Sequence, residues 1–180
     1  MPILLMCAFS VGEKPLELRL DGGELVHLGR FRQRALLVVL ALHANEVVST
    51  NRLYDLLWFL HPPAKTPAAH LVQISISRLR RALGPASNRL VTRPPGYVLE
   101  VGLDEIDAGR CEPLYESALA SLAAGEAAEA AEPLREAEAL WRGPPLAEFT
   151  YEGFAQETIG RLEWRRFVAV GAEPAGVRER

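Results

Sequence analysis

Residues 66–83 read TPAAHLVQISISRLRRAL, and this stretch decides the fold of the first half of the 180-residue chain. We predict a helix with Thr66 as its N-cap and Pro67 in its first turn, ended by Gly84-Pro85. At 100° per residue one narrow apolar stripe forms, made of Val72, Ile76, Leu79 and Leu83. The opposite side is mostly polar and basic, with Arg80 on the flank, and it carries His70, Gln73, Ile74, Ser77, Arg78 and Arg81.

A β-hairpin is predicted directly after this helix. Residues 89–92 and 97–101 have the composition of strands, and they flank the turn sequence Pro94-Pro95-Gly96. Arg93 stands at the shoulder of that turn. We expect this hairpin to be a wing that presents Thr92, Arg93 and Tyr97.

Two more helices and three strands are predicted ahead of residue 66. The Leu- and Val-rich residues 32–44 indicate a mostly buried helix, and residues 51–58 a second one, with Ser49 or Thr50 as its N-cap. Strands are expected at 3–9, 16–20 and 24–28, the last two joined by Asp21-Gly22-Gly23. Three helices followed by a hairpin are typical of an α+β winged helix-turn-helix, which we assign to residues 1–101.

The second half is rich in Ala and Glu and predicts an all-α domain of the tetratricopeptide type over residues 102–180. Asp104 is expected to cap a helix that runs to about Ala124, and Gly125 to break it. A second helix over 126–141 would pair antiparallel with the first, and a third is expected over 154–170. The tail 171–180 is expected to be unstructured.

Charge divides along the chain in the same way. Residues 1–99 carry twelve Lys or Arg against six Asp or Glu, a net +6, whereas residues 100–180 carry eight against seventeen, a net −9. Residues 61–99 contain no acid and six cations, which are Lys65, Arg78, Arg80, Arg81, Arg89 and Arg93. A polyanion is therefore a candidate partner of the first half only.

The patterns that enzymes, cofactor sites and metal sites require are missing. There is no GxSxG, P-loop or GxGxxG motif, so we predict no enzyme and no cofactor. Cys7 and Cys111 form no CxxC pair and are expected to be buried, and no metal-ligand spacing relates His27, His43, His61 and His70. We interpret the acids Asp104, Glu105 and Asp107 as helix-start charges, and the tryptophans as core anchors, namely Trp58, Trp141 and Trp164.

The basic helix face suits a DNA groove. Gln73 and Ser77 can hydrogen-bond base edges, Ile74 can touch a thymine methyl, and arginine can bind guanine or phosphate. Arg93 would reach the minor groove or the flanking backbone. Arginines near a helix C-terminus can equally form an ordinary solvated face that favours the helix dipole.

Two runs carry a family resemblance, Ile76-Ser77-Arg78-Leu79-Arg80-Arg81-Ala82-Leu83 and Val91-Thr92-Arg93-Pro94-Pro95-Gly96-Tyr97. With Asn45-Glu46-Val47-Val48-Ser49 and Leu140-Trp141-Arg142-Gly143-Pro144, they resemble the Streptomyces antibiotic regulatory proteins. The resemblance implies an OmpR-type winged helix followed by a bacterial transcriptional activator domain. It also implies binding to direct repeats upstream of antibiotic biosynthesis genes, as a homodimer or head-to-tail pair, and recruitment of RNA polymerase.

The chain departs from that family at several places. Phe59-Leu60-His61 occupies the connection that OmpR-type activators use towards polymerase, so these residues are candidate polymerase contacts. Pro133 is expected to interrupt the second helix of the activator domain, which also ends early. The alternative function is therefore a truncated decoy or a helical interaction adaptor. The apolar residues 3–9 are too short for a signal or membrane segment, which places the protein in the cytoplasm, at the nucleoid.

Overall fold

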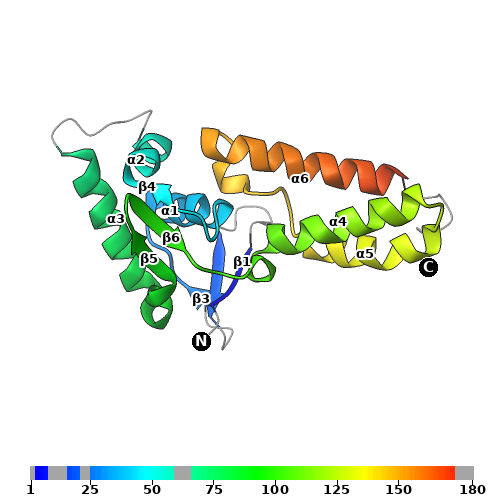
Figure 1. Ribbon diagram of the computed structural model, residues 1–180, viewed down its shortest axis with the longest axis horizontal. Helices are drawn as coiled ribbons and strands as arrows, with labels where there is room; N and C mark the ends of the chain where they lie inside the picture. The colour runs from blue at the N-terminus through cyan, green and yellow to red at the C-terminus, as the bar shows by residue number, and fades with distance from the viewer. Residues whose placement is uncertain (1–2, 8–15, 21–24, 59–65, 173–180) are drawn as a thin grey trace. The chain divides into compact units, whose positions relative to one another are not determined.

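The computed structural model describes residues 3–7, 16–20, 25–58 and 66–172 of the chain. The described residues form two compact units (Figure 1). The first contains residues 3–6 and 17–105, and the second contains Cys7, Leu16 and residues 106–172. The winged helix-turn-helix followed by a helical region, predicted from the sequence, is confirmed.

Strands begin the chain. They are β1 (Ile3–Cys7), β2 (Glu17–Leu20) and β3 (Leu25–Val26), and they form a sheet in the order β1-β2-β3. β2 and β3 run antiparallel, with Leu18 opposite Val26. Strands at all three predicted places are thus confirmed; the third ends at Val26, two residues earlier than expected, and residues 8 and 9 of the first lie outside the described residues. The turn Asp21-Gly22-Gly23 lies outside the described residues.

Three helices form the core of the first unit: α1 (Phe31–Leu42), α2 (Thr50–Trp58) and α3 (Ala68–Leu83), which pack against one another. Residues 35–41 of α1 are all buried, so this helix is apolar all round and lies at the centre. Ser49 is the cap of α2, because its Oγ accepts the backbone N–H of Arg52 at 3.2 Å. Trp58 is buried at the end of α2, as predicted.

The start of α3 differs from the prediction that Thr66 caps it. Pro67 occupies the capping position with ψ of 139°, and no side chain caps the helix there. The Pro67 carbonyl instead accepts the N–H groups of His70 and Leu71, at 3.0 and 3.2 Å. The helix thus begins at Ala68, one residue later than predicted, because the extended ψ of Pro67 keeps that residue outside the helix. At the other end Gly84, with φ of 54°, closes α3 as expected and leads into a 3₁₀ helix, Gly84–Arg89.

The predicted wing is a hairpin of β5 (Leu90–Arg93) and β6 (Gly96–Leu99), with Arg93 opposite Gly96. A strand that the sequence did not indicate, β4 (Val48–Ser49), pairs with β6 on its other side. Gly96 makes this pairing possible, because a Cβ there would lie 1.9 Å from the Val48 carbonyl oxygen. The wing is therefore the outer part of a three-stranded sheet.

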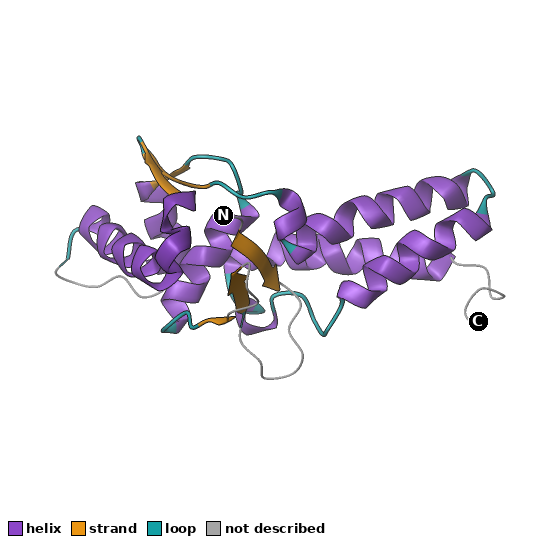
Figure 2. Ribbon diagram, turned by 90° about the horizontal axis from the view of Figure 1, so that it is seen from below, coloured by secondary structure: helices purple, strands orange, loops and turns teal. Residues whose placement is uncertain are grey.

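The second unit is helical, with α4 (Asp107–Ala123), α5 (Ala127–Leu140) and α6 (Gly153–Ala172) (Figure 2). α4 and α5 form the expected antiparallel pair around Gly125, whose φ is 80°, and α6 packs on α4. Small and apolar side chains fill the contacts between the helices, namely Cys111, Tyr115, Ala118, Ala130, Leu134, Ala137, Ala155, Leu162 and Ala169.

Three predictions about this unit were wrong. Asp104 does not cap α4, because it lies in a 3₁₀ turn (Leu103–Glu105) and the helix begins at Asp107. Pro133 does not interrupt α5, because Ala130 and Leu134 are buried on either side of it and hold both turns in place despite the lost N–H. Trp164 is not a core anchor but 65% exposed, since it faces away from the side of α6 that Leu162 buries.

Candidate nucleic-acid interface

The predicted two-sided character of α3 is confirmed. Its buried residues are Val72, Ile76, Leu79 and Leu83, all at most 1% exposed. The other side of the helix is open to solvent at His70, Gln73, Ser77, Arg78 and Arg81, while Ile74 is half-buried. α3 thus presents hydrogen-bonding groups and cations along the side opposite its buried stripe.

Arg78 and Arg81 are the free cations of this face. Both are exposed, and neither has a hydrogen-bonding or ion-pair partner among the described residues. They lie one turn apart on the last half of α3, where a positive charge is favoured by the helix C-terminus. Their guanidinium groups are available to a phosphate or a guanine edge.

Arg80 behaves differently from its neighbours. Its Nε and Nη2 donate to the Leu90 carbonyl at 3.0 and 2.7 Å, and Nη2 also donates to the Thr92 Oγ1 at 2.8 Å. The guanidinium carbon lies 6.0 Å from the centre of the Tyr97 ring. The sequence predicted Arg80 as a DNA contact on the flank of the helix, and in the structure its side chain turns towards the wing.

The wing presents two of its three predicted contacts to solvent. Thr92 and Arg93 are exposed, whereas Tyr97 is only 8% exposed and belongs mainly to the core. The turn between the strands is attached to α2, because the N–H and the Oγ1 of Thr50 both donate to the Pro95 carbonyl at 3.2 Å. Arg93 donates through Nη2 to Glu100 Oε1 at 3.0 Å, so in the free protein it is already paired with a carboxylate.

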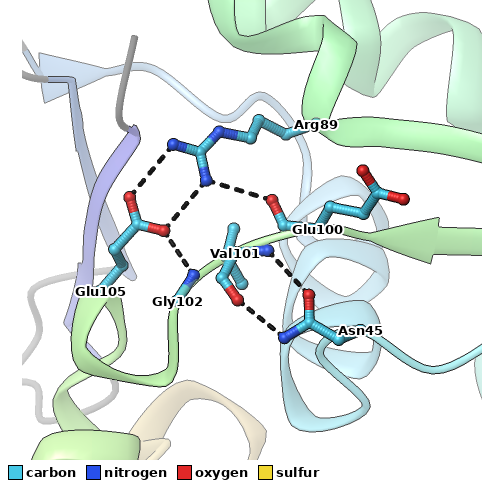
Figure 3. Close-up of polar contacts among 6 residues, drawn as sticks. All are labelled: Asn45, Arg89, Glu100, Val101, Gly102 and Glu105. Carbon is cyan, nitrogen blue, oxygen red and sulfur yellow. Dashed lines mark hydrogen bonds and ion pairs between the residues drawn. The ribbon is translucent and has the colours of Figure 1, made fainter.

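A polar cluster that the sequence did not reveal holds the segment after the wing (Figure 3). Arg89 makes a two-pronged contact with Glu105, at 3.0 and 3.3 Å, and also donates to the Glu100 carbonyl at 3.2 Å. Asn45 donates to the Val101 carbonyl at 2.8 Å and accepts the Val101 N–H at 3.2 Å. Asn45 has φ of 66°, a left-handed conformation that asparagine tolerates better than most residues.

The cationic surface is therefore smaller than the sequence count suggests. Of the six cations in residues 61–99, Arg80, Arg89 and Arg93 have partners within the first unit. Lys65 and the candidate polymerase contacts Phe59, Leu60 and His61 lie outside the described residues.

The second unit contains a polar centre of its own, in which Tyr115 is buried and the side chains of Glu138 and Arg166 are 33% and 41% exposed. The hydroxyl of Tyr115 donates to Glu138 Oε1 at 2.7 Å, and Arg166 donates to both oxygens of the same carboxylate. Hydrogen bonding to Glu138 raises the pKa of Arg166, and burial raises the pKa of Tyr115. Burial also raises the pKa of the Cys111 thiol to about 11, so this buried cysteine is an uncharged packing residue, as predicted.

No group of three or more His, Cys, Asp or Glu side chains is placed to hold a metal ion in the part of the chain that the structure covers. Likewise, none of the described helices has the length and hydrophobicity needed to cross a membrane.

Known families match both units. Residues 23–99 match the family described as "Transcriptional regulatory protein, C terminal", and residues 106–173 match the "Bacterial transcriptional activator domain".

Several known proteins are similar over most of the chain. The transcriptional regulatory protein MoaR1 of Mycobacterium tuberculosis is 40% identical over 79% of this chain and 46% of its own length. The transcriptional regulatory protein EmbR of the same organism is 33% identical, over 73% and 34%. The regulatory protein DnrI of Streptomyces peucetius is 32% identical, over 84% and 58%. The chain thus spans less than two thirds of each of these relatives.

A solved structure agrees with these relatives. M. tuberculosis EmbR in complex with a low affinity phosphopeptide superposes with a TM-score of 0.79 and 28% identity, covering 96% of this chain and 44% of that one. Its match spans both units, and the matched proteins are regulators rather than enzymes. The chain belongs to the Streptomyces antibiotic regulatory protein family of transcriptional regulators.

Proposed function

We propose that the protein binds duplex DNA in a sequence-specific way, with α3 in the major groove and the wing on the adjacent backbone or minor groove. The observation that carries this proposal is the exposed face of α3, where cations without protein partners stand beside neutral hydrogen-bonding side chains. A solvated face that only favours the helix dipole would not need Gln73 and Ser77 in line with Arg78. DNA binding is assigned to residues 1–101.

The side chains divide by the part of DNA they suit. Gln73 and Ser77 suit base edges, Ile74 suits a thymine methyl, and Arg78 suits the two acceptors of guanine. His70 and Arg81, towards the two ends of the face, suit phosphates. On the wing, Thr92 and Arg93 suit the backbone or the minor groove.

The regulatory role that follows is activation of secondary-metabolite genes. The protein would bind direct repeats as a homodimer or head-to-tail pair, and recruit RNA polymerase holoenzyme in the cytoplasm, at the nucleoid. Residues 102–180 would act as the activator domain, and Phe59, Leu60 and His61 would contact polymerase.

One feature of the second unit favours the alternative, an interaction adaptor or a decoy without activating function. Trp164 and Phe167 on α6 are 65% and 70% exposed, with ring centres 6.0 Å apart. Beside them lies a groove of about 650 Å³ whose apolar lining includes Trp141, Pro144, Pro145 and Val170. Exposed aromatic residues beside a groove are typical of a protein-binding surface.

Footprinting combined with transcription in vitro separates the two functions. An activator protects repeated sites upstream of the regulated genes and raises transcript yield with polymerase holoenzyme. A decoy protects the sites without raising transcription, and an adaptor does neither. Absence of protection on every upstream region of the genome at low salt would disprove DNA binding.

A further inference from the structure

Arg80 is the side chain through which the groove helix holds the wing. Its three hydrogen bonds reach two residues of β5, the buried Leu90 and the exposed Thr92. A guanidinium group is planar and its N–H groups have a fixed geometry, so bonds to two points on one strand set the angle of that strand to the helix. The ring of Tyr97 on β6 packs beside the same guanidinium.

The contact with Thr92 also orients the hydroxyl. A threonine hydroxyl has one proton to donate and two lone pairs to accept. Because Arg80 Nη2 donates to Oγ1 at 2.8 Å, the hydroxyl accepts on the protein side and keeps its own proton for another acceptor. Thr92 is exposed and precedes Arg93, so that acceptor can lie outside the protein.

Direct contact between Arg80 and DNA would work against this arrangement. Nε and Nη2 are held by the protein, so a phosphate could reach only Nη1 unless the guanidinium left the carbonyl of Leu90, a residue only 1% exposed. A strand carbonyl that loses a charge-assisted hydrogen bond in such a place is costly. Arg78 and Arg81, by contrast, have no described partner to abandon.

We propose that Arg80 is a positioning residue, which fixes the wing to α3 so that the Thr92 hydroxyl and Arg93 meet the DNA backbone while Arg80 stays on the protein. This inference rests on the proposed DNA binding. With Arg80 in this role, α3 and the wing bind DNA as one rigid unit. The backbone contacts of the wing then depend on a side chain that does not touch the DNA.

A double-mutant cycle between Arg80 and Arg93 tests the inference. The probe is a mixed-sequence duplex of about 30 base pairs, since phosphate contacts do not depend on sequence. In the otherwise unaltered protein, Arg93→Ala should weaken binding about tenfold, the loss of one charge-assisted bond. In the Arg80→Met background the same change should weaken binding less than about twofold, because the wing is no longer held in place.

Arg81→Met is the matched control, because it removes the same charge from the next residue of α3 without a link to the wing. In that background Arg93→Ala should keep its full tenfold effect. Arg80→Lys keeps the charge but loses the fixed pair of N–H groups that Nε and Nη2 direct at the Leu90 carbonyl, so the Arg93→Ala effect in this background should lie between those in the Arg80→Met and unaltered backgrounds. Thermal melting confirms that each variant folds, and Arg80→Lys replaces Arg80→Met if the latter does not.

The outcomes distinguish this inference from the function on which it rests. If the Arg93→Ala effect is the same in the Arg80 backgrounds as in the unaltered protein, Arg80 is not a positioning residue, although DNA binding stands. Full affinity of Arg80→Lys, together with an undiminished Arg93→Ala effect in the Arg80→Met background, would identify Arg80 as a simple phosphate contact. If the unaltered protein does not bind the duplex at low salt, DNA binding fails, and the role of Arg80 fails with it.

Discussion

The arginines of α3 and of α6 have opposite surroundings, although both helices are amphipathic. On α6, Arg161, Arg165 and Arg166 each donate to a carboxylate of a neighbouring helix, at 3.0, 2.6 and 2.6 Å, and these partners are Glu112, Glu116 and Glu138. On α3, Arg78 and Arg81 meet no carboxylate among the described residues. The cations of α6 thus fasten a helix to its own unit, whereas Arg78 and Arg81 of α3 have no such partner among the described residues.

The difference shows that the number of arginines in a helix says little about nucleic acid binding. The deciding feature is whether carboxylates lie within reach of the guanidinium groups. Residues 1–99 have few acids, and the structure places two acids that follow them, Glu100 and Glu105, against Arg93 and Arg89. Four predictions test this contrast.

The largest effect is expected in the second unit, where the arginines of α6 are paired with carboxylates. Glu138→Ala should lower the free energy of unfolding of the second unit by about 2 to 3 kcal/mol, because it leaves the hydroxyl of the fully buried Tyr115 without its acceptor and removes the ion pair of the partly exposed Arg166. Urea unfolding measures the change. Glu129→Ala, an exposed acid of the same helix, is the control and should stay within about 0.5 kcal/mol. Equal effects of the two variants would remove the polar centre as a source of stability.

On α3, Arg78→Ala should weaken specific DNA binding by about 1 to 3 kcal/mol, the cost of one contact with a base edge. The stability of the protein should not change, because Arg78 has no partner among the described residues. Arg165→Ala removes an equal charge from α6 and should not change DNA affinity. Anisotropy titrations with operator and scrambled duplexes, together with melting curves, give both quantities. Loss of affinity in Arg165→Ala would show that the paired cations also reach DNA.

The sequence alone predicted the local features of this surface but not the contacts between distant residues. The apolar stripe of α3 and the turn of the wing were predictable, because periodicity and turn residues are local signals. The partners of Arg89 and Asn45 were not, because Glu105 and Val101 lie 16 and 56 residues further along the chain. No local pattern says which distant group a side chain will face.

Strand β4, the continuity of α5 and the direction of Arg80 could not be predicted from the sequence, for similar reasons. Strand β4 has only two residues, too few for an alternating pattern, and it exists because Gly96 lets β6 approach it. The continuity of α5 through Pro133 depends on packing against α4, which outweighs the local cost of proline. The direction of Arg80 was hidden in the same way, since a position on the flank of a helix is compatible with solvent or with a neighbouring strand.

A smaller effect is expected in the salt dependence of binding. Arg81→Gln should reduce the slope of log K against log salt by about 0.9, the contribution of one phosphate contact. Arg161→Gln should leave the slope unchanged, because Arg161 is already neutralised by Glu112. Titrations over a series of salt concentrations measure both slopes. If the two variants shift the slope equally, charge acts through the net field of the protein and not through contacts of α3.

The smallest effect concerns Arg93, which lies between the two extremes. It is exposed like Arg78 but paired with Glu100 at 3.0 Å, and the two side chains are 56% and 46% exposed. An exposed pair of this kind contributes less than about 1 kcal/mol, so DNA can displace Glu100 at a small cost. Glu100→Gln removes that cost and the repulsion between a carboxylate and the phosphates. Affinity for duplex DNA should therefore rise by about twofold to fivefold at low salt.

The gain in Glu100→Gln should depend on Arg93. In an Arg93→Ala background Glu100 has no cation to hold, and only the general repulsion of its charge remains, so Glu100→Gln should then raise affinity by less than about twofold. Glu46→Gln, which alters an exposed acid elsewhere in the first unit, measures that general repulsion. Should Glu100→Gln and Glu46→Gln raise affinity equally, Glu100 does not compete with DNA for Arg93. Arg93 would then be no more available to DNA than the paired arginines of α6.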